Sequence, residues 1–94
     1  MTNLDVIKSF INHNPNSIAH LLSTGDKLYS YSTCIAEYYL DVLLVNITYY
    51  SNTTSHHLGL LKRNYPSDIL IVCLDRIPQD SQYLHLRYER HKRD

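Results

Sequence analysis

The sequence is poor in the residues that form several familiar kinds of functional site. It has only two glycines, Gly25 and Gly59, so it contains no glycine-rich loop of the kind that surrounds phosphate groups. Its longest strictly apolar run, Ile69–Leu74, is far too short to cross a membrane, and we find no signal peptide. The two cysteines, Cys34 and Cys73, lie far apart within apolar runs, which favours buried free thiols in a reducing compartment. We therefore expect a cytoplasmic protein with no metal, cofactor or membrane anchor.

A surplus of charge of either sign is also missing. Nine Lys and Arg residues balance nine Asp and Glu residues, so no overall field draws the protein toward nucleic acid or an anionic membrane. No Lys or Arg occurs between Leu28 and Leu61, whereas basic residues gather near the C-terminus, between residues 85 and 94. The simpler interpretation of that terminal cluster is a solvated tail that keeps a small protein in solution.

The choice of aromatic residues is unusual for a chain of this size. With 94 residues, the chain is long enough for a single domain, 1–94, and too short for a second core. It has nine tyrosines, one phenylalanine and no tryptophan. Because nearly every ring then carries a polar hydroxyl, the rings suit half-exposed sheet faces and interfaces better than a sealed core.

Two blocks rich in hydroxyl groups lie within the segment that has no Lys or Arg. The first spans residues 29–33 and the second spans residues 48–57. Tyr, Ser, Thr and His offer hydrogen-bond donors and acceptors without fixed charge, so they can bind a partner through many modest contacts. We predict that the binding surface consists of Tyr29, Tyr31, Thr33, Thr48, Tyr50, Ser51, Thr53, Thr54, Ser55 and His57.

Hydrophobic periodicity predicts an α+β domain in the order helix, β-hairpin, helix, strand, strand, with a mainly antiparallel sheet of about four strands and helices packed on one face. A first helix should follow Thr2 or Asn3, and a second short helix is plausible from Asn16 to Gly25. The remaining expected elements are hairpin strands over about 27–36 and 42–50 with a turn at 39–41, a helix over about 54–64, a central strand covered on both faces over 69–74, and a strand over 82–89.

This arrangement would bring the two hydroxyl blocks together. In a hairpin, the start of the first strand faces the end of the second strand. The free backbone N–H groups at the start of the helix near Thr54 would point toward the same place. An anion could bind there, although a run of Ser, Thr and Asn before a helix is more often a simple cap.

The same residues are compatible with two other kinds of function. His57 could activate a neighbouring hydroxyl as a nucleophile in a small hydrolase or nuclease, but structural hydrogen bonding to those hydroxyls is the simpler interpretation. Adjacent His56 and His57 cannot both bind one metal ion from a helix. A nucleic-acid-binding protein would stack bases on the tyrosines and contact phosphates with Lys62, Arg63, Arg87, Arg90, Lys92 and Arg93.

The middle third of the chain resembles a small uncharacterised family found on bacteriophages, viruses and mobile elements. In that family a strand of the form L-Y-S-Y-x-T-x-I-A precedes a segment of the form N-x-T-x-Y-S-x-T-T-S-x-H. Here Leu28–Ala36 matches the strand, and Asn46–His57 matches the segment. The family's recurrent polar residues fall on Tyr29, Ser30, Tyr31, Thr33, Asn46, Thr48, Tyr50, Ser51, Thr53, Thr54, Ser55 and His57.

The resemblance implies a small accessory protein of a virus or mobile element that acts by binding in the cytoplasm of the host cell. Its partner would be a host protein or complex, and antagonism of a host defence complex is the role that we expect. Nucleic-acid binding and hydrolysis remain the alternatives. The apolar segment Ile69–Leu74 could also be covered by a second copy of the chain, as a homodimer.

Overall fold

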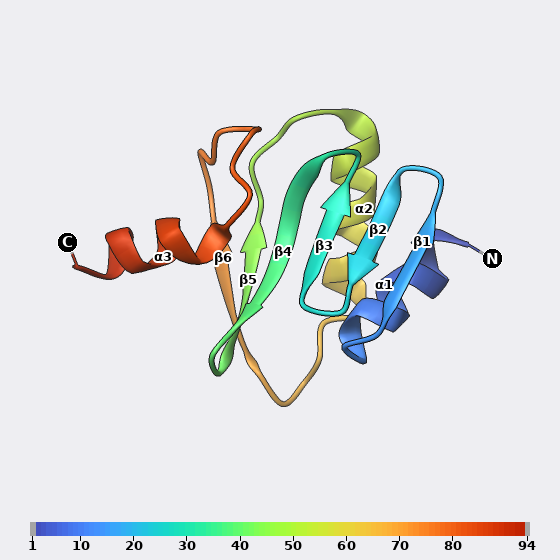
Figure 1. The fold of residues 1–94 in the computed structure, drawn as a ribbon, viewed down its shortest axis with the longest axis horizontal. Helices are drawn as coiled ribbons and strands as arrows, with labels where there is room; N and C mark the ends of the chain where they lie inside the picture. Colours follow the sequence, from blue (N-terminus) through green and yellow to red (C-terminus); the bar gives the residue numbers. More distant parts are fainter. Residues whose placement is uncertain (1, 94) are drawn as a thin grey trace.

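The computed structural model describes residues 2–93, with side chains described through residue 89, and it shows a single mixed sheet with three helices (Figure 1). The elements are α1 (Asn3–Ile11), β1 (Pro15–Ile18), β2 (Leu21–Thr24), β3 (Lys27–Ser30), β4 (Thr33–Tyr39), β5 (Val42–Asn46), α2 (Asn52–Arg63), β6 (Leu70–Leu74) and α3 (Leu84–Arg93). The small α+β class is therefore confirmed, whereas the expected number and order of strands are wrong.

The six strands follow one another across the sheet in chain order, from β1 at one edge to β6 at the other. Neighbours from β1 to β5 are antiparallel, and β6 pairs with β5 in parallel. A parallel pair needs a crossover connection, which α2 supplies between β5 and β6. The result is a meander of hairpins that ends in a β-α-β unit.

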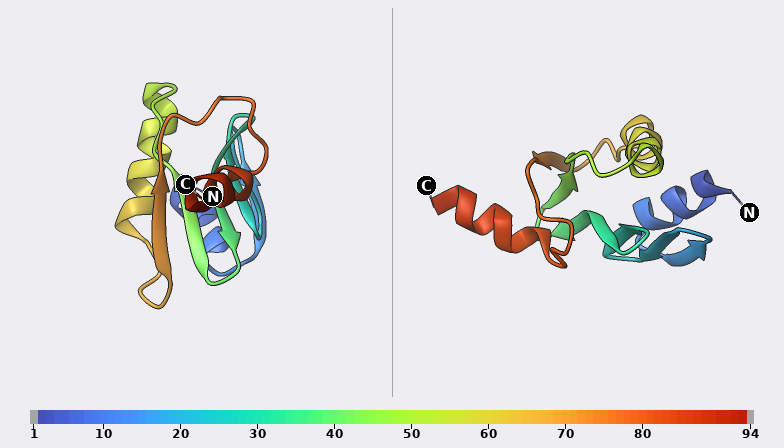
Figure 2. Two further views of the ribbon diagram at one scale, coloured as in Figure 1. Left: turned by 90° about the vertical axis from the view of Figure 1, so that its left-hand side faces the viewer. Right: turned by 90° about the horizontal axis from the view of Figure 1, so that it is seen from above.

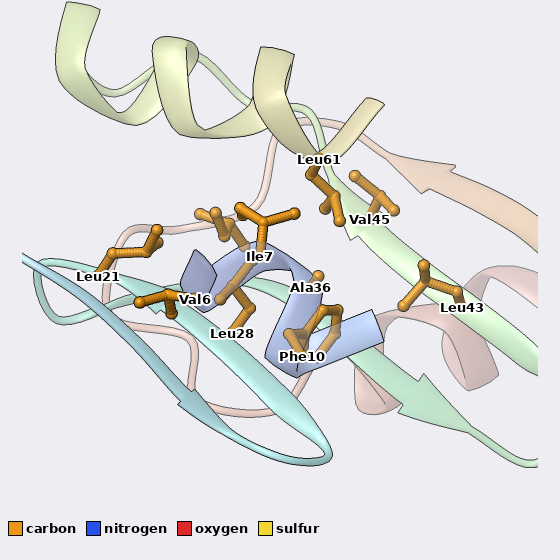
Figure 3. Close-up of a cluster of buried hydrophobic side chains, with 10 residues drawn as sticks. Val6, Ile7, Phe10, Leu21, Leu28, Ala36, Leu43, Val45 and Leu61 are labelled. Atoms are coloured by element: carbon orange, nitrogen blue, oxygen red, sulfur yellow. The ribbon is translucent and has the colours of Figure 1, made fainter. Parts of the chain in front are cut away.

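The helices cover both faces of the sheet. Helices α1 and α2 lie on one face, and α3 leads away from the opposite face at the β6 side (Figure 2). The first face holds the main core, in which Phe10 and Ile7 of α1 meet Leu61 of α2 over the sheet (Figure 3). A smaller cluster on the second face packs Leu84 of α3 against Leu44. The expectation that all helices share one face is therefore wrong.

A β-bulge in β4 explains how two adjacent residues reach the main core. Leu28 pairs with Ala36 while Tyr29 pairs with Cys34, so Ile35 is the extra residue. Ile35 and Ala36 both enter the main core, while Cys34 belongs to the cluster on the second face.

The segment expected as a second helix, Asn16–Gly25, is the β1–β2 hairpin and the turn that follows it. Leu21 and Ser23 are buried whereas Leu22 and Thr24 are exposed, so the side chains alternate with a period of two. Gly25 has φ 101° in the next turn, and a Cβ there would lie 2.9 Å from the carbonyl oxygen of His13.

The strand expected over residues 82–89 is helix α3. Leu84 and Tyr88, one helical turn apart, belong to the cluster on the second face, whereas Leu86 between them is 60% exposed. Leu84, Leu86 and Tyr88 therefore alternate along the sequence as in a strand, but only Leu84 and Tyr88 lie on the packed face of the helix.

The first expected hairpin strand is also interrupted. Tyr31 and Ser32 form a two-residue turn between β3 and β4, and Tyr31 has φ 59°. The expected turn near Leu40 is present, but β5 ends at Asn46. The segment 69–74 forms an edge strand rather than a central one.

Among the described residues, no helix is long and apolar enough to cross a membrane.

Candidate functional site

The two hydroxyl blocks meet where the β3–β4 turn lies beside the start of α2. The Ser30 hydroxyl is 2.7 Å from Nδ1 of His57 and 3.0 Å from the Thr54 hydroxyl. Ser51 is the N-cap of α2, and its hydroxyl accepts a hydrogen bond from the Thr54 backbone N–H at 3.1 Å. We call Ser30, Ser51, Thr54 and His57 the hydroxyl cluster. It joins the third strand to the helix through side chains that are far apart in the sequence.

The hydroxyl cluster is closed to solvent at its centre. Ser30, Thr54 and His57 are all buried. Burial lowers the pKa of His57, and the nearby His56 and His20 lower it further. His57 is therefore neutral at physiological pH, so one of its ring nitrogens is an acceptor and the other is a donor.

A serine within hydrogen-bonding distance of a histidine is also found at nucleophilic active sites. Here the Ser30 side chain has no exposed surface, so no substrate can reach its hydroxyl in this arrangement. None of the carboxylates described by the structure forms a hydrogen bond or ion pair with His57 to orient it. The geometry is that of a structural hydrogen-bond network.

A second network holds the connection between β5 and α2. The Asn46 side chain donates to the Cys34 carbonyl oxygen at 3.2 Å and to the Tyr50 hydroxyl at 2.9 Å. The Thr48 hydroxyl accepts from the Ile77 backbone N–H at 2.9 Å, and the Tyr50 hydroxyl donates to the Ile77 carbonyl oxygen. These bonds fix the path of the chain into α2.

The ten residues of the expected binding surface therefore differ in how far they are buried. Tyr31, Thr53 and Ser55 are exposed; Thr33, Thr54 and His57 are buried; and Tyr29, Thr48, Tyr50 and Ser51 are half-buried. Tyr29 lies with the cluster on the second face of the sheet and not with the helix start. About one third of the expected set is thus fully available to a partner.

The exposed members have several exposed neighbours that also carry no fixed charge. The Tyr31 ring stacks on His20 with a centroid separation of 4.4 Å, and the Tyr49 hydroxyl donates to Asn52 at 2.9 Å. Tyr31 is 50% exposed and Tyr49 is 68% exposed. We call this surface the uncharged edge, which comprises His20, Tyr31, Ser32, Tyr49, Asn52, Thr53, Ser55 and His56.

An open depression of about 410 Å³ adjoins the uncharged edge at His20, Tyr31 and Ser32. It is lined by Ser17, Ala19, His20, Leu21, Leu22, Tyr31 and Ser32. None of these residues carries a fixed charge, so the depression offers apolar and hydroxyl contacts beside the stacked His20 and Tyr31 rings.

The basic residues considered for phosphate contacts are spread over two helices. Lys62 and Arg63 are exposed in the last turn of α2, and Arg87 is half-buried in α3. The side chains of Arg90, Lys92 and Arg93 lie outside the described residues.

Within the part that the structure describes, no three His, Cys, Asp or Glu side chains form a group able to hold a metal ion.

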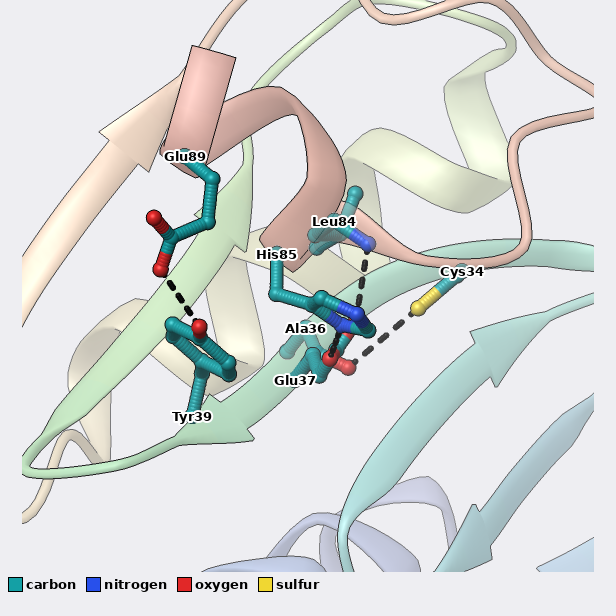
Figure 4. Close-up of polar contacts among 7 residues, drawn as sticks. All are labelled: Cys34, Ala36, Glu37, Tyr39, Leu84, His85 and Glu89. Carbon is teal, nitrogen blue, oxygen red and sulfur yellow. Dashed lines mark hydrogen bonds and ion pairs between the residues drawn. The ribbon is translucent and has the colours of Figure 1, made fainter. Parts of the chain in front are cut away.

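Sequence reasoning missed a polar group on the second face of the sheet, where α3 begins (Figure 4). Glu37 is buried, and its carboxylate accepts from the Leu84 backbone N–H at 2.8 Å and contacts Nδ1 of His85 at 2.5 Å. Tyr39 donates to Glu89, and this bond raises the pKa of Tyr39. Glu37 is the one charged residue between Leu28 and Leu40, which is the signal that could have drawn attention to it.

Cys34 lies near this group and is chemically inert. Its thiol is buried and donates to the Ala36 carbonyl oxygen at 3.5 Å. Burial raises the pKa of the Cys34 thiol to about 12, so the reactive thiolate is rare near neutral pH. The expectation of a buried free thiol is met at Cys34, whereas Cys73 is exposed.

The chain matches the model of a protein family over most of its length. The model of a family of unknown function, DUF8033, matches residues 3–76, which include the sheet, α1 and α2 and end before α3. No curated protein and no solved structure matches the chain.

Proposed function

The chain belongs to the DUF8033 family, whose function is unknown, and we propose that it is a binding module that recognises another protein through the uncharged edge. One observation carries this proposal. Tyr31 and Tyr49 are well exposed at an edge without fixed charge, while the Ser30 and Thr54 hydroxyl groups are already hydrogen-bonded inside the protein.

The exposed rings are held before a partner arrives. The Tyr31 backbone N–H donates to the His20 carbonyl oxygen at 2.7 Å, and the two rings stack. The Tyr49 hydroxyl is held by Asn52. A tyrosine that is already ordered loses little conformational entropy on binding, and tyrosine is enriched among the residues that dominate interface energies. The rings are therefore suited to anchor a protein surface.

The hydroxyl cluster supports the edge from inside. Ser30 precedes Tyr31 directly, and its bonds to Thr54 and His57 fix the turn against α2. Loss of this support would release the turn that carries Tyr31. In this proposal His57 is a positioning residue for the binding surface and not a contact residue.

The arrangement gives less support to nucleic-acid binding. Tyr49 precedes α2, whereas Lys62 and Arg63 lie in its last turn. A rise of 1.5 Å per residue separates these ends of the helix by about 15 Å. Rings and cations on this helix thus do not form the continuous groove in which bases stack while phosphates are neutralised.

We further propose that the protein is an accessory factor of a virus or mobile element and that it acts in the host cytoplasm on a host defence complex. The support for this context is the resemblance of Leu28–Ala36 and Asn46–His57 to the pattern described above. An edge without charge is consistent with binding that depends on shape more than on electrostatic steering.

The test is affinity capture from host lysate with matched variants. Wild type should retain a stoichiometric protein partner. The double variant Tyr31→Ala/Tyr49→Ala should lose it by at least about tenfold, because truncation of an interface tyrosine commonly costs more than 1 kcal/mol. The matched control Lys62→Ala/Arg63→Ala, which removes two exposed side chains at the far end of α2, should retain it.

Salt dependence separates the two kinds of partner. Binding at the uncharged edge should change little between low and moderate salt, whereas phosphate contacts weaken steeply. Recovery of nucleic acid that is lost with added salt and with Lys62→Ala/Arg63→Ala would contradict the proposal. Failure of wild type to retain any partner from the host would also count against it.

A further inference from the structure

The two edges of the sheet differ in how they are protected. An edge strand presents unpaired backbone groups, and proteins usually blunt such edges with proline, charge, bulges or short length. At one edge, β1 has four residues and begins with Pro15. At the other edge, β6 has five residues, Leu-Ile-Val-Cys-Leu, with no charge, proline or bulge. The β6 edge therefore lacks the usual protection.

The unpaired backbone groups of β6 can be identified by residue. The Leu74 carbonyl oxygen accepts from the Ile47 backbone N–H, so Leu74 directs its backbone groups toward β5. Backbone groups alternate in direction along a strand, so Ile71 and Cys73 direct theirs away from the sheet. In the part of the chain that the structure describes, no loop or side chain forms a hydrogen bond with these outward groups.

The side chains of β6 are also incompletely covered. Leu70 is 65% exposed, Cys73 is exposed, and Ile71 and Val72 are only half-buried. Exposed apolar side chains beside free backbone groups are the features of a strand that pairs with another chain.

We propose that β6 pairs antiparallel with β6 of a second copy, with the two-fold axis passing beside Val72, so that two sheets join into one. In this register Ile71 lies opposite Cys73 of the second copy, and their outward backbone groups form two hydrogen-bonded pairs. Val72 lies opposite Val72 of the second copy at a position without hydrogen bonds, where side chains are closest. The pairing is isologous, as a closed dimer requires.

The charges at the two ends of β6 favour a second copy as the occupant. Asp68 precedes the strand, and Arg76 follows it, and both are exposed. An antiparallel partner centred on Val72 brings Arg76 of the second copy to the end of the strand where Asp68 lies, and the reverse pair forms at the other end. Each end of the joined strands thus holds one basic and one acidic residue of opposite copies, while the exposed Asp75 falls opposite the uncharged Ile69 of the second copy.

Disulfide formation tests the register directly. In a Cys73→Ser background, Val72→Cys should form a covalent dimer on mild oxidation, because an opposed pair with Cα atoms about 4.5 Å apart falls within disulfide geometry. The matched control Leu70→Cys lies on the same side of the strand, but two copies of it would be offset by about 13 Å and should not crosslink. Equal crosslinking of both variants, or of neither, would overturn the register.

Light scattering of variants with exchanged charges tests for the dimer without a cysteine crosslink. Wild type should be dimeric at about 100 μM. Arg76→Glu should raise the dissociation constant about tenfold, because each of two symmetric pairs becomes repulsive, and Asp68→Arg/Arg76→Glu should restore it. Wild type that is monomeric throughout, or a dimer indifferent to Arg76→Glu, would overturn the proposal. A monomer that pairs through β6 only with a different protein would also overturn it.

Discussion

At the scale of single residues, Ser30 connects the two halves of the hydroxyl cluster. Its hydroxyl lies between Thr54 and His57, and all three side chains are buried. A buried polar group that loses its partner pays the cost of desolvation without compensation. The stability of the fold should therefore depend on Ser30 more than on the exposed hydroxyls that surround it.

Ser30→Ala should lower the free energy of unfolding by about 1–3 kcal/mol, because Thr54 and His57 each lose a hydrogen-bond partner. The matched control is Ser32→Ala in the adjacent turn, where the side chain is exposed and the change should be within about 0.5 kcal/mol of zero. Urea unfolding of both variants measures the difference. Equal effects would show that the cluster does not contribute to stability.

His57 should make folding stability depend on pH. Its pKa is lowered in the folded protein, so the unfolded chain binds a proton more readily. The stability contributed by neutral His57 is fully present above its ordinary pKa of 6.5 and is lost as the pH falls toward the lowered folded value. His57→Asn, which can still place a polar atom near Ser30, should show a flatter stability profile over this range. Parallel profiles for the two proteins would refute this assignment.

At the scale of elements, the predictions from the sequence were correct where neighbouring residues alone determine the structure. Thr2 caps α1 in a capping box with Asp5, and Ser51 caps α2, as the Ser and Thr residues before each helix indicated. The turn near Leu40 was also predicted correctly. These features depend on residues within a few positions of one another.

Elements whose identity depends on distant contacts were not predictable. Residues 82–89 alternate like a strand, but Glu37 of β4 accepts from the first backbone N–H of α3, and the cluster on the second face selects the helical spacing. The turn at Tyr31 was not predicted because Tyr is not a typical turn residue and Ser favours turns more weakly than Gly, Asn or Asp. In the candidate site, the residue types were enough to predict a cluster of hydroxyl groups. Which of these residues are buried, and therefore out of reach of a partner, could be learned only from the fold.

Helix α3 should depend on Glu37 for its attachment. Glu37→Ala removes the acceptor of the Leu84 N–H and the partner of His85, whereas Glu37→Gln keeps a neutral acceptor. We expect amide hydrogen exchange in α3 to accelerate strongly in Glu37→Ala and less in Glu37→Gln, while α1 amides stay protected. Unchanged exchange in α3 of both variants would mean that apolar packing alone holds the helix.

At the scale of the whole molecule, the proposed surfaces are formed by different parts of the fold. The uncharged edge is built from turns and the start of α2, and the proposed dimer contact is the outer side of β6. A dimer would present two copies of the uncharged edge, and a partner with repeated sites would then bind with avidity. Variants of Arg76 should therefore alter partner binding only through the oligomeric state.

Site-specific photo-crosslinking in host lysate tests binding at the uncharged edge most directly. A photoreactive phenylalanine analogue at Tyr31 should form a covalent product with one partner protein, since this ring belongs to the uncharged edge and is 50% exposed. The same analogue at Lys62, which is exposed at the far end of α2, should not. Crosslinking from Lys62 but not from Tyr31 would place the partner elsewhere and contradict the account.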